Sequence, residues 1–340
     1  MQHRLAIHPN ERSFAGRWIE WCVQENVSHK IVDCYQSNII EQLKDCTALA
    51  WHIGGVSKDL LMGRGLLYSL EIAGVPVFPN FRTSFHFDDK VAQKYLLEAI
   101  DAPLVETWVF YDQSEALRWA QQASFPKVFK LRGGSGSRNV RLVKDRSMAI
   151  GLIKKAFRRG FAPGGMVTQE AWKLAAARKR GDLSRFLSDI PAKLAQRSNL
   201  KRLAGREIGY AYFQEFVPGN SYDIRITVIG KRAFAFTRDV RPNDFRASGS
   251  GRICYDISRI PHSFVQLAFE IARKIEAQSI AFDFLQDSHG VPLVNEISFG
   301  YAPSAVHECP GRFDSHLRWI EGRMWPEHAI LEDLLGMQPS

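Results

Sequence analysis

Short apolar runs alternate with segments of helical periodicity over roughly the first eighty residues. The pattern predicts strands at residues 5–8, 30–35, 48–53 and 75–78, and helices at 14–25, 39–45 and 59–73. Such alternation is typical of a parallel sheet covered by helices on both faces. Gly74 predicts a helix end from which the chain returns to the sheet. The first predicted strand is not followed by a Gly-x-Gly-x-x-Gly motif, so the usual dinucleotide fingerprint is missing.

The pattern changes near residue 88, after which hairpins and isolated helices follow. Helices are predicted at 89–100, 114–122 and 261–277, and strands at 107–111, 127–131, 140–143, 210–217, 223–238, 280–285 and 293–297. The 223–238 segment is expected to fold back on itself, and the last two strands are expected to pair. The last forty residues are predicted to form packing helices and loops. We therefore expect three domains, at residues 1–87, 88–215 and 216–340, with an insertion at 166–207 in the second.

Composition places the chain among ordinary globular proteins. It has 340 residues, of which 45% are hydrophobic and 24% charged, which excludes disordered and collagen-like classes. No apolar run approaches the length of a membrane span and the N-terminus is polar, so we expect a cytoplasmic protein without transmembrane segments. The five cysteines are scattered without a Cys-x-x-Cys pair, and we expect them to be reduced.

The positive charge is concentrated in one segment. The chain carries a formal net charge of +9, and residues 171–206 contain ten basic side chains against only Asp182 and Asp189. Apolar residues recur there at helical spacing, which predicts one apolar and one cationic face. Two interpretations remain open. The segment is either a helical insertion packed on its own domain with a solvated basic face, or a docking surface for an anionic polymer, lipid headgroup or acidic tail.

Residues 130–140 combine a lysine, an arginine and three glycines, in the sequence Lys-Leu-Arg-Gly-Gly-Ser-Gly-Ser-Arg-Asn-Val. Glycine lets backbone N–H groups approach phosphate oxygens closely, because no Cβ blocks the way. The Gly-x-x-x-x-Gly-Lys-Ser/Thr motif of a P-loop is absent, and the loop joins two strands. It therefore predicts a glycine flap over a nucleotide, with a plain turn as the alternative.

Charged residues inside apolar strands give the second group of candidates. Asp283 and Glu296 lie in two strands whose hairpin sets them nearly opposite one another. Two converging carboxylates share either a cation such as Mg²⁺ or a counter-charge, so a magnesium site and a salt-bridged pair are both open. Asp223 and Arg225 share a strand face, and Arg238, Arg241 and Arg246 follow; such arginines suit an acidic substrate or lie on the surface.

The order of these motifs along the chain resembles that of ATP-grasp enzymes, in particular the glutathione synthetase and RimK-type branch. The resemblance runs from about residue 88 to 300 and implies an α/β fold with an N-terminal parallel α/β (pre-ATP-grasp) domain. It implies nucleotide-binding roles for Lys90, Lys130, Gly133, Gly134, Ser135, Gly136, Gln214, Glu215, Phe216, Asp223 and Ser248. Within this set the two lysines would contact phosphates, residues 214–216 would form the adenine hinge, and Asp223 would contact the ribose. It implies catalytic roles for Arg225, Arg238 and Arg246, and metal-binding roles for Asp283, Glu296 and Ser298.

Two motifs depart from the family pattern. The terminal Glu-x-Asn of the family reads Glu296-Ile297-Ser298, so a hydroxyl or water stands in for the third metal ligand. The usual Phe-Arg-x-Asn reads Phe245-Arg246-Ala247-Ser248. Residues 171–206 also lengthen the link between glycine loop and hinge beyond the common form.

The resemblance implies a carboxylate–amine ligase. A substrate carboxylate would attack the γ-phosphoryl group of ATP, and an amine would capture the acyl phosphate with release of ADP and phosphate. The cofactors would be ATP and Mg²⁺, with two ions expected and Mn²⁺ as an alternative metal. The partners would be a small or polymer-borne carboxylate and an amine, without specific nucleic acid; an anionic surface could contact 171–206, and a homodimer is possible. Alternative functions are an ATP-grasp small-molecule kinase or a basic binding protein for an anionic polymer.

Overall fold

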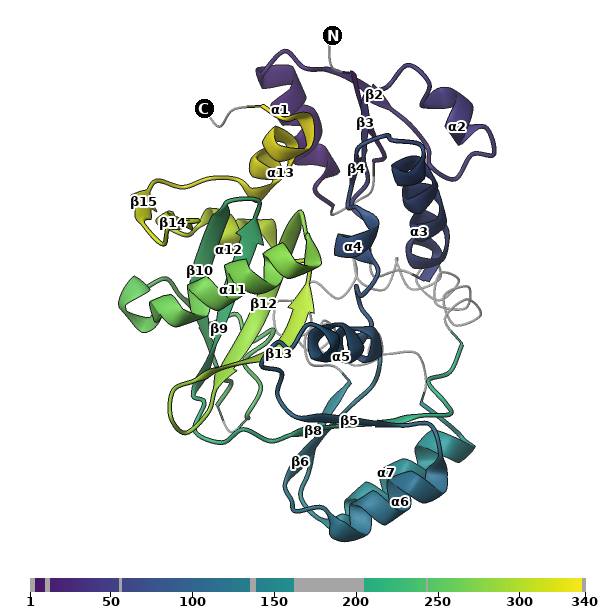
Figure 1. Cartoon of the computed structure of the whole chain (residues 1–340), viewed down its shortest axis with the longest axis vertical. Helices are drawn as coiled ribbons and strands as arrows, with labels where there is room; N and C mark the ends of the chain where they lie inside the picture. Colours follow the sequence, from purple (N-terminus) through teal and green to yellow (C-terminus); the bar gives the residue numbers. More distant parts are fainter. Residues whose placement is uncertain are drawn as a thin grey trace, which may run out of the picture. The chain divides into compact units, whose positions relative to one another are not determined.

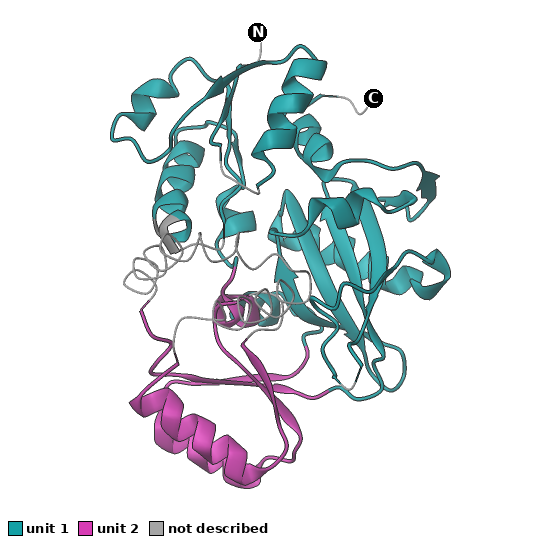
Figure 2. Cartoon of the chain, turned by 180° about the vertical axis from the view of Figure 1, so that it is seen from behind, with its two compact units in different colours: residues 1–87, 95–104, 217–340 teal, residues 88–94, 105–216 magenta. Residues whose placement is uncertain are grey.

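The computed structural model describes residues 4–9, 13–54, 57–134, 139–161, 205–242 and 244–337. It divides into two compact units (Figure 2). Unit 1 comprises residues 1–87, 95–104 and 217–340, and unit 2 comprises 88–94 and 105–216. Most of the predicted insertion at 166–207, with its helical face, lies outside the described residues, as do Ser135 and Gly136. The division into three domains stays a prediction.

Unit 1 contains a parallel sheet in the order β2-β1-β3-β4 (Figure 1). Its elements are β1 (Arg4–Ile7), α1 (Ala15–Gln24), β2 (Ser28–Ile31), α2 (Ile39–Gln42), β3 (Ala48–Ala50), α3 (Ser57–Ile72) and β4 (Val77–Phe78). The alternation predicted from the sequence is therefore confirmed. Gly74 has the positive φ of 77° expected where the chain leaves α3.

A larger, antiparallel sheet of unit 1 has the order β13-β12-β9-β10-β14-β15, with β11 paired to β10. Its strands are β9 (Tyr222–Ile229), β10 (Arg232–Asp239), β11 (Ile253–Cys254), β12 (Ser279–Gln286), β13 (Pro292–Ser298), β14 (Gly311–Asp314) and β15 (Trp319–Glu321). Both predicted hairpins are present. Helix α11 (His262–Ile275) covers one face, where Ile226, Phe264 and Phe282 are fully buried (Figure 1).

One apolar core joins the parallel sheet to the other face of this second sheet. Trp18 of α1, Phe78 of β4, Phe236 of β10 and Phe299 after β13 all belong to it. The remaining elements of unit 1 are α4 (Phe81–Ser84), η1 (Ile257–Arg259), α12 (Pro303–His307) and α13 (Pro326–Leu335), of which α13 contributes four side chains to this core. The end of the chain thus folds onto its beginning. The prediction of packing helices and loops for the last forty residues is correct for α12 and α13, but it missed the strands β14 and β15, which are short and whose partner β10 lies far along the chain.

Unit 2 is built on a four-stranded antiparallel sheet in the order β5-β8-β6-β7. Its strands are β5 (Thr107–Phe110), β6 (Lys127–Lys130), β7 (Val140–Val143) and β8 (Ala211–Glu215), and its helices are α6 (Gln113–Gln122) and α7 (Arg146–Arg158). The two helices lie side by side on the sheet (Figure 1). Helix α5 (Lys90–Ala99) begins in this unit.

Helix α7 was not among the helices predicted from the sequence. Its signals are nevertheless present, because the Asp145 side chain accepts a hydrogen bond from the backbone N–H of Met148 at 2.9 Å. Ala149, Leu152 and Ile153 recur on its buried face. Capping aspartate and apolar spacing together form an ordinary helix-start pattern.

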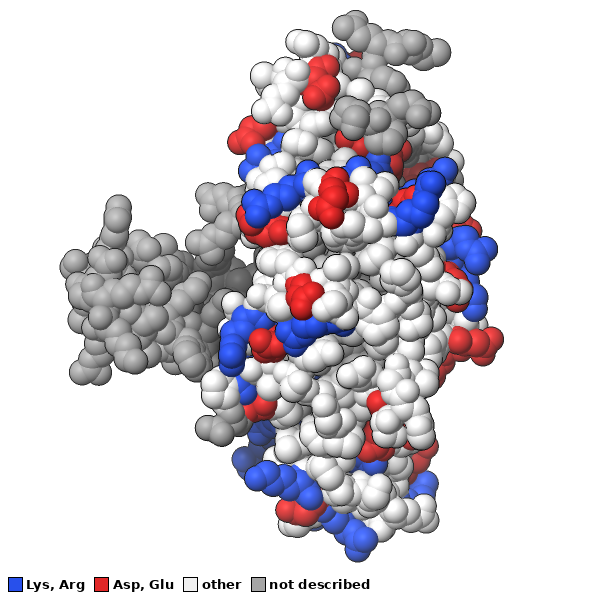
Figure 3. Space-filling view, turned by 90° about the vertical axis from the view of Figure 1, so that its left-hand side faces the viewer, with Lys and Arg blue, Asp and Glu red and all other residues white. Residues whose placement is uncertain are grey.

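Surface charge over the described residues is mixed in sign. On the face shown in Figure 3, Lys and Arg side chains lie next to Asp and Glu side chains. This agrees with the sequence, in which residues 171–206 hold nearly all of the positive excess. No described helix is long and apolar enough to cross a membrane.

Candidate functional site

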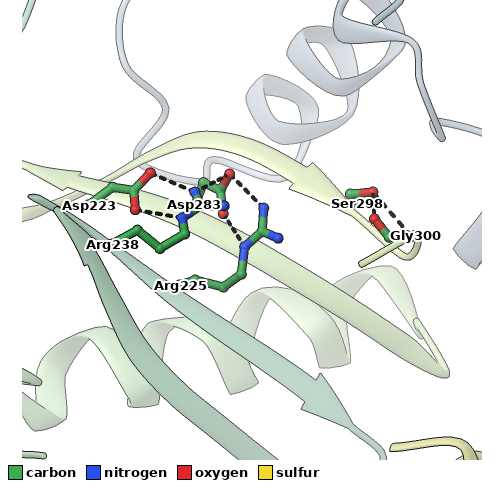
Figure 4. A network of polar contacts seen from close by, with 6 residues as sticks. All are labelled: Asp223, Arg225, Arg238, Asp283, Ser298 and Gly300. Atoms are coloured by element: carbon green, nitrogen blue, oxygen red, sulfur yellow. Dashed lines mark hydrogen bonds and ion pairs between the residues drawn. The ribbon is translucent and has the colours of Figure 1, made fainter. Parts of the chain in front are cut away.

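Two aspartates and two arginines form a buried network on the antiparallel sheet of unit 1, which we call the Asp–Arg network (Figure 4). Arg225 donates to both carboxylate oxygens of Asp283, Nε to Oδ1 at 2.6 Å and Nη2 to Oδ2 at 2.8 Å. Arg238 binds Asp223 in the same bidentate way, at 2.8 and 2.6 Å. The Nη2 of Arg238 also lies 2.8 Å from Oδ2 of Asp283, which joins the two pairs.

Strand register explains why these four residues meet. Arg225 of β9 lies opposite Asp283 of β12, and Asp223 lies opposite Arg238 of β10. Directly opposed residues share a face of the sheet, and residues two apart share it along a strand. The prediction that Asp223 and Arg225 share a face is therefore confirmed.

The Asp–Arg network balances its own charge, with two carboxylates against two guanidinium groups. Burial acts to raise the pKa of Asp283. The guanidinium groups of Arg225 and Arg238 outweigh this effect and hold the pKa well below its ordinary value. Bidentate, charge-assisted bonds of this kind are the strongest side-chain hydrogen bonds. Asp283 consequently stays ionised and fixed in position.

The two predicted metal carboxylates also lie opposite one another, since Asp283 of β12 pairs with Glu296 of β13. Ser298 follows on the same face of β13, but its hydroxyl is used in a local turn. It donates to the carbonyl oxygen of Gly300 at 2.9 Å and accepts from the Gly300 N–H at 3.1 Å. Figure 4 shows this turn apart from the Asp–Arg network.

The glycine loop of unit 2 begins beside the two predicted phosphate lysines. Lys130 is buried at the end of β6, where the loop starts. The side chain of Lys90 donates from Nζ to the carbonyl oxygen of Gly134 at 2.8 Å. The backbone N–H of Lys90 donates to the carbonyl oxygen of Arg132 at 2.9 Å. Gly134 has φ of +111°, and a Cβ there would lie 2.5 Å from Nδ2 of Asn139, so only glycine fits.

The predicted adenine hinge lies at the end of β8. Gln214 is buried and donates from Nε2 to Oγ1 of Thr107 at 3.2 Å. Glu215 forms an ion pair with Lys127, and its Oε1 accepts from the N–H of Phe216 at 3.2 Å. Both polar side chains of the hinge thus have protein partners from the same sheet.

The predicted third arginine lies in a loop closed by Asp244. The Arg246 side chain donates to the Asp244 carboxylate at 2.6 to 3.0 Å. Arg241 donates to the carbonyl oxygen of Ser248 at 2.8 Å. Because Arg246 and Ser248 lie in this loop rather than on the strands, the structure does not place them in the Asp–Arg network.

Comparisons with known proteins identify the fold, although no family model matches the chain. The chain is 20% identical over 246 residues to the alpha-aminoadipate–LysW ligase LysX of Saccharolobus solfataricus, covering 72% of this chain and 73% of that protein. A RimK-domain ATP-grasp protein from Sphaerobacter thermophilus superposes with a TM-score of 0.58 and 16% identity, over 97% of this chain and 98% of that chain. The chain has the ATP-grasp fold.

A second ATP-grasp-like neighbour was solved with a nucleotide and metal. The biotin carboxylase domain of 2-oxoglutarate carboxylase from Hydrogenobacter thermophilus, in complex with MgADP, ADP and bicarbonate, superposes with a TM-score of 0.60 and 13% identity. The match covers 100% of this chain and 71% of that chain. The family resemblance inferred from the sequence is therefore confirmed at the level of the ATP-grasp fold.

The predicted site residues fall into two groups within this ATP-grasp chain. Lys90, Lys130, the glycine loop and the hinge belong to unit 2, whereas the carboxylates and arginines belong to unit 1. The described residues contain no cluster of three His, Cys, Asp or Glu side chains that could hold a metal ion. A magnesium site would therefore need substrate oxygens or water besides Asp283 and Glu296.

The Asp283–Glu296 pair fits a magnesium ion by its chemistry. Carboxylate oxygens are the ligands Mg²⁺ prefers, and Mg²⁺ sites often use one or two carboxylates plus substrate phosphates. The hydrogen bonds and ion pair described above occupy three of about four lone-pair positions of Asp283, which leaves capacity on Oδ1. A metal role for the pair stays a prediction, while the hydroxyl of Ser298 is engaged with Gly300.

Several polar residues that hold the glycine loop were not predicted from the sequence. Asp88 accepts from the Gly134 N–H at 2.7 Å, and Asn139 donates to the Gly133 carbonyl at 2.8 Å. Glu207 and Tyr210 also reach the loop from a position far along the chain. Asp88 and Asn139 could have been suspected because they flank Lys90 and the glycines, but no sequence signal connects Glu207 to this loop.

Proposed function

We propose that the chain is an ATP-dependent carboxylate–amine ligase that works through an acyl phosphate and releases ADP and phosphate. The glycine loop is the main support for the proposal. In this ATP-grasp fold, two lysines lie beside a loop whose Gly134 tolerates no side chain. The similarity to a ligase, and to a neighbour solved with MgADP, supports it.

Each group of residues has a distinct role in this proposal. Lys90 and Lys130 neutralise phosphate charge, and the hinge at 214–216 orients the base. The lysines stabilise negative charge that is already present on the phosphates of ATP, and also charge that develops as the phosphoryl group moves. The glycine loop excludes water from the reactive acyl phosphate when substrate is bound.

The carboxylates and arginines of unit 1 have a metal- and anion-binding role in this proposal. Asp283 and Glu296 would hold Mg²⁺, which supplies charge neutralisation at the phosphates. Arg225 and Arg238 keep Asp283 ionised and oriented, so that its free lone pair is available. Arg225, which is more exposed than Arg238, also contacts the substrate carboxylate or the phosphoryl group.

The test compares Lys130→Ala and Glu296→Ala with the wild type in an ADP-release assay over pairs of carboxylates and amines. Removing one preorganised electrostatic contact costs roughly a hundred- to thousandfold in rate, so we expect ATP consumption to fall by that factor in each folded variant. Lys144→Ala and Glu270→Ala, at exposed positions of the same units, serve as matched controls and should retain the wild-type rate.

Hydroxylamine added to the wild-type reaction should yield a hydroxamate, because it captures an acyl phosphate. ADP release without hydroxamate would favour the kinase alternative. Wild-type ATP turnover in purified, folded Lys130→Ala or Glu296→Ala would contradict the assignment of these residues.

A further inference from the structure

The first turn of the glycine loop is held by two side chains that no motif connects to it. The N–H of Gly133 donates to Oε1 of Glu207 at 3.4 Å, and the N–H of Arg132 donates to the hydroxyl of Tyr210 at 2.7 Å. The Tyr210 hydroxyl in turn donates to Oε2 of Glu207 at 2.6 Å. Glu207 and Tyr210 therefore form one hydrogen-bonded unit that binds two consecutive amides.

The third backbone N–H of this turn also binds a side chain, because the N–H of Gly134 donates to the carboxylate of Asp88. These three amides therefore bind protein groups, and their role is to shape the loop. Backbone N–H groups in such turns are costly to leave unpaired. Without its side-chain acceptors, the turn from 132 to 134 keeps only the hydrogen bonds that its carbonyl groups accept from Lys90 and Asn139, and its N–H groups lose their partners among the described residues.

Glu207 is itself fixed by the backbone at the end of α7. Its N–H and carbonyl pair with those of Phe161 at 3.0 and 2.8 Å. A Cβ at Gly160 would lie 2.7 Å from the Glu207 carbonyl oxygen, so this approach requires glycine. Arg206 adds hydrogen bonds to the carbonyls of Arg159 and Gly160 at 2.6 and 3.1 Å. The Glu207 carboxylate is thus presented from a rigid base.

Tyr210 completes the arrangement as a donor that stays protonated. Burial, together with the Glu207 carboxylate, raises the pKa of Tyr210 above its ordinary value. The hydroxyl can therefore donate to Glu207 and accept from Arg132 at the same time. Tyr210 lies immediately before β8, the strand that leads to the hinge.

We propose that Glu207 and Tyr210 are positioning residues that hold the Arg132–Gly133 turn in the conformation needed to bind the phosphates of ATP. The inference rests on the proposed function, because it assigns these residues to the nucleotide site. They act through the loop backbone and do not touch the nucleotide. Their loss therefore weakens nucleotide binding by loosening the loop, while the phosphate lysines stay in place.

The experiment measures binding of a non-hydrolysable ATP analogue with Mg²⁺ to Glu207→Ala and Tyr210→Phe of the full chain. Each change removes two hydrogen bonds, and we expect the Kd to rise about five- to tenfold. Glu207→Gln keeps an oxygen acceptor for Gly133 and should bind within about threefold of the wild type. Glu115→Ala and Tyr111→Phe, both exposed in unit 2, are the matched controls and should bind like the wild type.

Amide hydrogen exchange of residues 131–134 in the nucleotide-free protein gives a second readout. We expect faster exchange there in Glu207→Ala and Tyr210→Phe, with unchanged exchange in β12 and β13, which shows that the rest of the chain stays folded. A folded variant with unchanged analogue affinity, or with unchanged exchange at 131–134, would overturn the positioning role while leaving the proposed function intact. A wild-type chain that fails to bind the analogue would instead overturn the proposed function and the role that rests on it.

Discussion

Arg238 is 7% exposed and lies between two carboxylates. The sequence alone could not decide whether this arginine lies on the surface or in a site, because an arginine in a strand fits both. One partner, Asp223, comes from β9 of the same hairpin, and the other, Asp283, comes from β12, which is distant in sequence and is brought beside Arg238 only by strand register. The guanidinium group of Arg238 is already bonded to Asp223 and Asp283. A catalytic contact between Arg238 and the phosphoryl group therefore stays a prediction.

Glu327 is the second residue whose environment gives it an unusual property. It lies in the first turn of α13, is 2% exposed, and its Oε2 has no hydrogen-bond partner among the described residues. Burial raises the pKa of Glu327 to about 7. The folded state therefore prefers the protonated form of the Glu327 carboxyl. Its contribution to the free energy of unfolding is fully present below pH 4.5 and is lost as the pH rises through 7.

We therefore expect Glu327→Gln to stabilise the protein at pH 8, because the amide removes the cost of ionising a buried carboxyl. The pKa difference corresponds to about 3 kcal/mol, an upper bound for the gain at pH 8. Near pH 4 the variant and wild type should have similar stability. Urea unfolding at pH 4 to 8 measures this difference, and Glu321→Gln, an exposed position, is the control. A gain that is the same at both ends of this pH range would contradict the buried-carboxyl explanation.

Among the elements, the described residues on either side of the segment 162–204 lie next to one another in unit 2. Phe161 and Glu207 form an isolated antiparallel bridge. In a hydrogen-bonded antiparallel pair the Cα atoms are about 5.5 Å apart. The two ends of the segment can therefore be joined by a short turn without strain on the rest of unit 2.

We expect that replacing residues 163–204 by a short Gly/Asn linker leaves the fold and analogue binding of the chain intact. Closing a shorter loop costs less entropy, so thermal stability should stay within a few degrees of the wild type or rise slightly. Thermal unfolding and analogue titration measure both quantities. If the variant aggregates or loses the analogue, the segment contributes to the core or to the nucleotide site. Activity retained on every carboxylate substrate of the wild type would contradict a docking role for 171–206.

At the scale of the whole molecule, the predicted nucleotide residues are divided between the two compact units. Lys90 and Lys130 belong to unit 2, and Asp283 and Glu296 to unit 1. A ligand that binds both groups in the native state, and neither in the unfolded chain, must stabilise the native state as a whole.

We expect the Mg²⁺-bound ATP analogue at about a hundred times its Kd to raise the free energy of unfolding by about 2.7 kcal/mol. Thermal unfolding with and without the analogue should show a shift of several degrees. Hydrogen exchange should slow in β6 of unit 2, which carries Lys130. Unchanged exchange there at saturating analogue would contradict the phosphate-binding role of Lys130. Adenosine alone, without phosphates, is the control and should give a much smaller shift.

Most of the elements, and the chemistry available to them, could be predicted from the sequence. Apolar periodicity predicted the parallel sheet, both hairpins and most helices, because period and burial are local properties of a strand or helix. The face shared by Asp223 and Arg225, and the opposition of Asp283 to Glu296, also followed from spacing and hairpin geometry.

Which charged side chains meet depends on how the strands pair in the folded protein. Sequence left open whether Asp283 faces a cation or an arginine, and the pairing of β9 with β10 and β12 placed two guanidinium groups beside it. Likewise, Glu207 reaches Gly133 across 74 residues of chain. Hydrogen bonds and ion pairs act over a few ångströms, so partners distant in sequence become neighbours only when the sheets have formed.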